Sequence, residues 1–171
     1  MKKKDPLQSH SPHPPSRKPP GRRRQARELA LQLLYAMEIT SYDMESTLED
    51  YNRMQRRERN KPGENREEMK ISPVPMNDFT KNLLTTVQGH QKELDELLRA
   101  VITNWKLERL SHIDRNILRL AGAEICFFQD IPPKVTINEY IEIAKDFSDQ
   151  DSPSFINGIL DRIAKESGKG M

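Results

Sequence analysis

Hydrophobic side chains recur at helical spacing along most of the chain, and this pattern predicts a protein built from helices. The first helix is expected from about Arg22 to Ile39. A weaker amphipathic stretch follows from Ser41 to Met54. The residues that form the two apolar stripes are Leu29, Ala30, Leu33, Leu34 and Met37 in the first segment, and Met44, Leu48 and Tyr51 in the second.

The helical period continues through the second half of the chain. Apolar residues recur from Asn77 to Ile102 with an interruption at Gly89, which fits one bent helix or two short ones. Ser111 is a plausible N-cap for a segment that is apolar nearly all round, as expected of a helix in the middle of a bundle. Pro132 and Pro133 are expected to end that helix.

Two further helices are predicted from start signals. Thr136 and Glu139 have the spacing of a capping box, so a helix is expected from Thr136 to Phe147. Asp151 or Ser152 is expected to cap the last helix, because a proline follows just inside it.

The expected fold class is all-α, with about six helices that share one core, because no segment alternates with period two for long enough to be a strand. The length of 171 residues fits one domain with tails. Residues 1–20 are rich in proline and lysine and are expected to be a disordered tail. The domain is expected over 21–168, with a charged insertion at about 52–75 whose residues 55–75 form an exposed loop.

Charge is distributed unevenly along the chain. The net charge is +2, but residues 1–27 alone carry +8 and the rest therefore carries −6. Arg22, Arg23, Arg24 and Arg27 occupy the start of the first helix, where cations oppose the helix dipole. An anionic partner such as phosphate would explain them, because helix starts and guanidinium groups both favour it. The alternative is a solvated charged tail.

Candidate catalytic chemistry is sparse. The sequence contains no glycine-rich phosphate loop and no metal-binding histidine–glutamate pair. Asp149 and Asp151 are more easily explained as helix caps than as an acid–base couple, and His10 and His13 as tail residues rather than as metal ligands. We therefore predict a protein that is not an enzyme and that uses no cofactor and no metal.

The same features favour a particular compartment and ligand. A single cysteine, Cys126, excludes an intramolecular disulfide, and the sequence has no secretory signal and no apolar run near the roughly 18 residues of a membrane span, so a cytoplasmic protein is expected. RNA is favoured over DNA, because neither helix-turn-helix spacing nor a dimer seam is recognisable.

Several motifs resemble those of the NusB family. The arginine block with Glu28-Leu29-Ala30 and Leu33-Leu34-Tyr35 resembles the first helix of that family. The second half is more specific, and the motifs that match there are Asp114-Arg115, Ile117-Leu118-Arg119, Pro132-Pro133-Lys134-Val135-Thr136-Ile137-Asn138-Glu139, Ala144-Lys145, and Asp151 through Asp161.

The resemblance implies one all-α domain of six to seven helices in two subdomains. It also implies a transcription antitermination factor that binds the single-stranded boxA element of nascent ribosomal RNA with NusE, a small-subunit ribosomal protein, and so helps RNA polymerase to read through rRNA operons. Some family members pair with themselves, so a homodimer of the free protein is an open possibility.

Residue roles carried over from the family remain expectations. The expected RNA-binding residues are Arg22, Arg23, Arg24, Arg27, Lys134, Asp151 and Phe155, and the expected NusE-binding residues are Tyr35, Glu108 and Asp114. From the pattern alone, Phe155 and Tyr35 fit core positions and Asp151 fits a cap.

Two alternatives to the RNA-binding function remain: a protein-interaction module without direct RNA contact, and an RNA methyltransferase, which would require a cofactor-binding fold that this sequence lacks.

Overall fold

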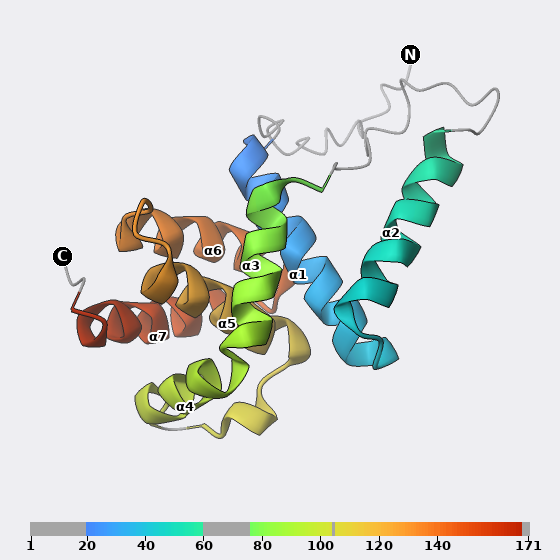
Figure 1. Cartoon of the computed structure of the whole chain (residues 1–171). Coiled ribbons are helices and arrows are strands. Elements are labelled where there is room, and N and C mark those ends of the chain that lie inside the picture. Colours follow the sequence, from blue (N-terminus) through green and yellow to red (C-terminus); the bar gives the residue numbers. More distant parts are fainter. Residues whose placement is uncertain (1–19, 60–75, 104, 169–171) are drawn as a thin grey trace, which may run out of the picture.

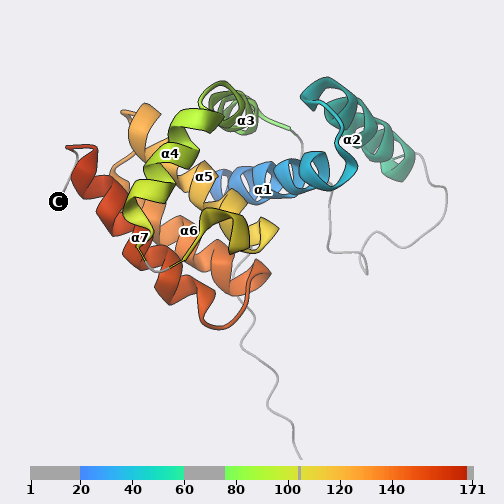
Figure 2. The same ribbon diagram turned by 90° about the horizontal axis from the view of Figure 1, so that it is seen from below.

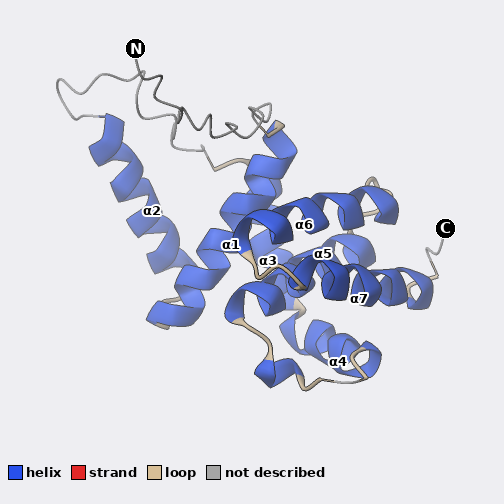
Figure 3. Cartoon of the chain, turned by 180° about the vertical axis from the view of Figure 1, so that it is seen from behind, coloured by secondary structure: helices blue, strands red, loops and turns tan. Residues whose placement is uncertain are grey.

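The computed structural model describes residues 20–59, 76–103 and 105–168, and all regular structure in those ranges is helical (Figure 3). The seven α-helices there are α1 (Arg22–Thr40), α2 (Met44–Arg59), α3 (Asp78–Gly89), α4 (Gln91–Val101), α5 (His112–Phe127), α6 (Pro133–Phe147) and α7 (Ser152–Glu166), with one 3₁₀ turn at Leu107–Arg109. The all-α prediction is confirmed. The predicted tail at 1–20 lies outside the described residues except for Pro20, as does the part of the predicted insertion at 60–75.

Helix α5 occupies the centre of the bundle and packs against α1, α3, α4, α6 and α7 (Figure 1). Its residues Ile117, Leu118, Leu120 and Ile125 have no exposed surface. Buried leucines of α1 and α3 and isoleucines of α6 and α7 complete one hydrophobic core. The sequence pattern therefore predicted the central helix correctly, because a helix that is apolar nearly all round has no polar face to turn toward water.

Helix α2 stands apart from the bundle, and its main packing partner is α1 (Figures 1 and 2). Met44, Leu48 and Tyr51 are partly buried against the core, as their spacing predicted. The helix continues to Arg59, so the expectation that residues 55–59 belong to a loop is wrong.

The local start and stop signals predicted some helix boundaries correctly and others not. Ser111 caps α5 as predicted, since its hydroxyl oxygen accepts a hydrogen bond from the Asp114 backbone N–H at 3.0 Å. Helix α6 begins at Pro133, three residues before the predicted Thr136. The Thr136–Glu139 capping box does not form, because Pro132 is the N-cap and Thr136 lies inside the helix. The two side chains contact other helices instead: Thr136 donates to Glu124, and Glu139 pairs with Arg24. None of the helices in the described part of the chain is long and apolar enough to cross a membrane.

Candidate nucleic-acid interface

The arginine block (Arg22, Arg23, Arg24 and Arg27) forms the first turns of α1, and its four side chains differ in how much of their surface is exposed. Arg22 and Arg23 are exposed, Arg24 is half-buried, and Arg27 is only 2% exposed. Gly21 precedes the helix and offers no side chain to cap it, and the first turn contains no acid. The start of α1 therefore combines the positive end of the helix dipole with clustered guanidinium groups, an arrangement that attracts anions.

The deepest arginine is held by a buried carboxylate of α5. Arg27 donates from Nε and Nη2 to the two oxygens of Glu124 at 2.9 and 2.6 Å, and Thr136 Oγ1 donates to the same carboxylate at 2.7 Å. Burial alone would lower the pKa of Arg27, but the hydrogen bonds to Glu124 and its negative charge raise that pKa above the ordinary value. Arg27 is therefore not available for direct phosphate contact. It ties the start of α1 to α5 instead.

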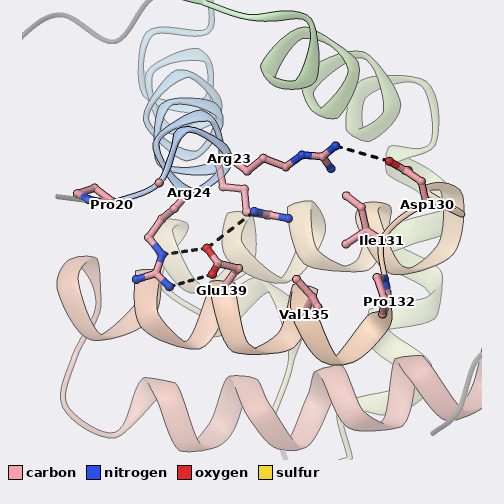
Figure 4. A pocket seen from close by; sticks show the side chains of 10 residues that line it. Pro20, Arg23, Arg24, Asp130, Ile131, Pro132, Val135 and Glu139 are labelled. Carbon is pink, nitrogen blue, oxygen red and sulfur yellow. Dashed lines mark hydrogen bonds and ion pairs between the residues drawn. The ribbon is translucent and has the colours of Figure 1, made fainter. Parts of the chain in front are cut away.

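The second arginine is held at the surface of α6. Arg24 donates from Nε and Nη2 to the two carboxylate oxygens of Glu139, both at 2.9 Å, and about a quarter of each side chain is exposed (Figure 4). The hydrogen bond from Arg24 lowers the pKa of Glu139, although partial burial opposes the shift. This bidentate pair orients the guanidinium group of Arg24 but leaves part of it open to solvent.

The lowered pKa of Glu139 predicts a pH-dependent contribution to stability. A carboxyl group whose pKa is lower in the folded state stabilises the fold above its ordinary pKa of about 4.3 and loses that contribution as the pH falls through the folded value. We expect Glu139→Gln to reduce the free energy of unfolding at pH 7, and the difference from the wild type to shrink as the pH falls below the ordinary pKa of a glutamate and through the lower folded value. Urea denaturation at a series of pH values measures this, and a difference independent of pH would contradict it.

The outermost arginine is held loosely. Arg23 Nη2 lies 3.7 Å from Asp130 Oδ2, and the two side chains are 59% and 69% exposed (Figure 4). The guanidinium carbon of Arg23 also lies 5.0 Å from the ring centroid of Phe79 on α3, within the range of a cation–π contact. Exposed ion pairs contribute about 0–1 kcal/mol, so the Arg23–Asp130 pair can exchange readily with an external anion.

A cavity of about 530 Å³ lies between the start of α1 and the segment that joins α5 to α6. The side chains of Arg23 and Arg24 line one side, and apolar Ile131, Pro132 and Val135 line the other (Figure 4). Its volume is within the range of small-ligand sites, and its walls combine cations with an apolar surface.

The remaining residues expected to bind RNA lie at two ends of α6. Lys134 is exposed at the start of α6, directly beside the cavity-lining Val135. Asp151 is exposed at the N-cap position of α7 and makes no side-chain capping bond, whereas Phe155 is half-buried against the core. Since an α-helix rises 1.5 Å per residue, roughly 20 Å separate the two ends of α6. Lys134 thus lies at the end of α6 that borders the cavity, whereas Asp151 and Phe155 lie at the opposite end.

Of the three residues expected to bind a protein partner, two are exposed and one is buried. Tyr35 is 41% exposed and meets the His112 ring edge-on at 6.3 Å between centroids. Glu108 is exposed and accepts from Arg99 at 3.0 Å. Asp114, by contrast, is only 8% exposed, and its carboxylate accepts hydrogen bonds from the hydroxyls of Ser148 and Ser152. Asp114 is therefore not available as a surface acid, because it joins the start of α5 to the start of α7.

Sequence reasoning missed three acidic residues at the arginine block. Glu124, Glu139 and Asp130 reach the arginines from positions more than 95 residues further along the chain. The only signal in the sequence was the unfavourable position of the arginines at a helix start, which required anions without indicating whether the protein itself supplies them. Among the described residues no group of three or more histidine, cysteine or acidic side chains could hold a metal ion, and His10 and His13 lie outside them.

Comparisons with known proteins agree with the motifs. The model of the NusB family matches residues 24–165. The transcription antitermination protein NusB of Trichlorobacter lovleyi is 41% identical over 143 residues, which cover 84% of this chain and 90% of that protein. The NusB of Myxococcus xanthus is 38% identical over 144 residues, which cover 84% and 95%.

Solved structures give the same result for the fold. NusB of T. maritima superposes with a TM-score of 0.66 at 34% identity and covers 88% of this chain and 94% of that one. A second structure, described as antitermination factors NusB and NusE in complex with double-stranded RNA, superposes with a TM-score of 0.65 over 85% of this chain and 97% of that one. At 23% identity, it supports the fold alone. The family match and the curated relatives together show that this chain belongs to the NusB family.

Proposed function

We propose that this protein is a transcription antitermination factor that binds the boxA element of nascent ribosomal RNA together with NusE. In this role it helps RNA polymerase to read through rRNA operons, in the cytoplasm where transcripts emerge. The observation that carries the proposal is the exposed cationic start of α1, formed by Arg22 and Arg23. The matched relatives are themselves named transcription antitermination proteins.

The chemistry of the α1 start favours a single RNA strand. Backbone N–H groups and guanidinium groups there can contact phosphates, while the neighbouring cavity has an apolar wall against which an unstacked base can pack. Duplex DNA would require a helix that presents several side chains to a groove, whereas these arginines lie at a helix end and become progressively buried along it. A strand of several nucleotides that follows α6 could also reach Asp151 and Phe155.

The proposed NusE-binding surface lies at the other end of α1. Tyr35, Ile39 and Tyr42 are 41%, 55% and 54% exposed there, an unusual density of apolar surface for one helix end. Glu108 lies four residues before His112, whose ring contacts Tyr35. A surface that combines aromatic side chains with an acid suits a basic ribosomal protein. Pairing of two copies of this chain through the same apolar surface is the competing use of it.

Alanine substitution of Arg23 and Arg24 tests the RNA contact. We expect the Arg23→Ala, Arg24→Ala variant to bind a boxA RNA about ten- to hundredfold more weakly. Hydrogen bonds to charged groups contribute about 1.5–3 kcal/mol each, and breaking the ion pairs with Asp130 and Glu139 offsets part of that gain when RNA binds. The dependence of log K on log salt should become shallower by about 1.4 if two phosphate contacts are lost. Fluorescence anisotropy at two salt concentrations measures both.

A charge-matched control is available on α2. Arg56 and Arg57 are exposed there, and replacing both with alanine removes the same net charge far from the cavity. That variant should bind RNA nearly as well as the wild type. Scrambled RNA and titrations with and without NusE complete the design: if NusE binds tightly while boxA RNA adds nothing to the complex, the protein-interaction module is the correct interpretation.

A further inference from the structure

The cavity beside the arginine block has two walls of different chemistry (Figure 4). Arg23 and Arg24 reach into it from α1, each with a carboxylate partner. Ile131, Pro132 and Val135 form the opposite wall, and Val135 is 46% exposed although it is apolar. An exposed apolar side chain between guanidinium groups suits a ligand that has both a flat apolar face and a negative charge.

Each of the three arginines has a nearest carboxylate, and these three pairs differ in burial and in the number of hydrogen bonds. The Arg27–Glu124 pair is buried and bidentate, and the Arg24–Glu139 pair is bidentate and half-buried. The Arg23–Asp130 pair has one contact at 3.7 Å, with both partners well exposed. An incoming phosphate would thus displace Asp130 at the lowest cost, because the carboxylate of Asp130 can regain water fully when it leaves Arg23.

We propose that this cavity takes one nucleotide of the bound RNA strand, with its phosphate on Arg23 in place of Asp130 and its base against Pro132 and Val135. This inference rests on the proposed RNA-binding function and names a subsite within it. Asp130 then acts as a built-in competitor: it occupies the anion position when RNA is absent. Its removal should strengthen RNA binding.

A double-mutant cycle tests the phosphate position. We expect Asp130→Asn to bind a boxA RNA about two- to fivefold more tightly than the wild type, the range that an exposed ion pair is worth. In the Arg23→Ala background the same substitution should have almost no effect, because the competitor has lost the group for which it competes. Glu96→Gln on α4 removes an exposed acid elsewhere and controls for net charge.

Modified RNA tests the base position. In a series of strands that each lack one base but keep the ribose and phosphate, loss of one particular base should weaken wild-type binding about threefold or more, because packing a base against Pro132 and Val135 removes apolar surface from water. In the Val135→Ala variant, removing that same base should reduce the affinity by a smaller factor, and removing any other base should have the same effect as in the wild type. An equal loss in the two proteins would overturn the assignment of the base to this wall.

The outcomes separate this subsite from the proposed function. If the wild type binds boxA RNA but Asp130→Asn gives no gain, or gives the same gain in the Arg23→Ala background and in Glu96→Gln, the subsite is wrong and the RNA-binding function stands. If the wild type binds boxA RNA no better than scrambled RNA, with or without NusE, the proposed function fails and the subsite fails with it.

Discussion

Replacing Arg27 with alanine is expected to lower the free energy of unfolding by about 3–5 kcal/mol, the usual cost of breaking a buried ion pair. The substitution leaves the Glu124 carboxylate, which has no exposed surface, with only the Thr136 hydroxyl as a hydrogen-bond donor among its described contacts. Burial strongly disfavours an unpaired charge, so the native state is destabilised. Urea denaturation at pH 7, followed by circular dichroism, measures the loss.

A paired substitution separates charge burial from packing. Arg27→Met combined with Glu124→Leu removes both charges and keeps most of the volume, so we expect it to recover much of the lost stability. A double variant that is as unstable as Arg27→Ala would show that the shape of the pair matters more than its charge. If Arg27→Ala itself is as stable as the wild type, then Arg27 is not the anchor of α1 that its contacts with Glu124 indicate.

Replacing Asp114 with alanine is expected to lower the free energy of unfolding by about 2–3 kcal/mol. Its carboxylate accepts from Ser148 and Ser152, and hydrogen bonds to charged groups contribute about 1.5–3 kcal/mol each. Without these two hydrogen bonds, the start of α5 should be held less firmly against the start of α7. Thermal denaturation measures the stability, and NusE affinity measured on the folded protein should stay close to that of the wild type.

Asp149→Ala is the matched control, since Asp149 is an exposed acid in the turn between α6 and α7. It should leave both stability and NusE binding almost unchanged. A large loss of NusE affinity in a stable Asp114→Ala protein would instead restore the role in partner binding that the family resemblance implied for Asp114.

The periodicity of apolar residues was sufficient to predict the fold class because burial decides most helical faces here. Ile117, Leu118 and Leu120 predicted a central helix, and the structure confirms it. The start of α6 was misplaced because Thr136 and Glu139 satisfy a local capping pattern, whereas tertiary partners on α5 and α1 compete for the same side chains. Pro133 is the better start signal, because a proline in the first turn lacks only an N–H group that has no partner within the helix.

The candidate site was predictable only in outline. Four arginines at a helix start implied an anionic partner, but the anions that Arg24 and Arg27 contact are carboxylates of the protein itself. Glu124, Glu139 and Asp130 decide which arginines remain available for an external anion. These acids lie far from the arginines in the sequence, so the sequence alone does not indicate the ion pairs. Arg23 is exposed and Arg27 is buried because of how α1 is rotated about its own axis relative to α5. The apolar stripe of α1 does not determine this rotation to within one residue.

The loose attachment of α2 has a consequence for how this protein accommodates variation. Because α1 is the main support of α2, a substitution on the exposed face of α2 displaces none of the helices around α5. Local opening of α2 would break mainly its contacts with α1, so α2 can unfold or change its surface charge while the rest of the bundle remains intact.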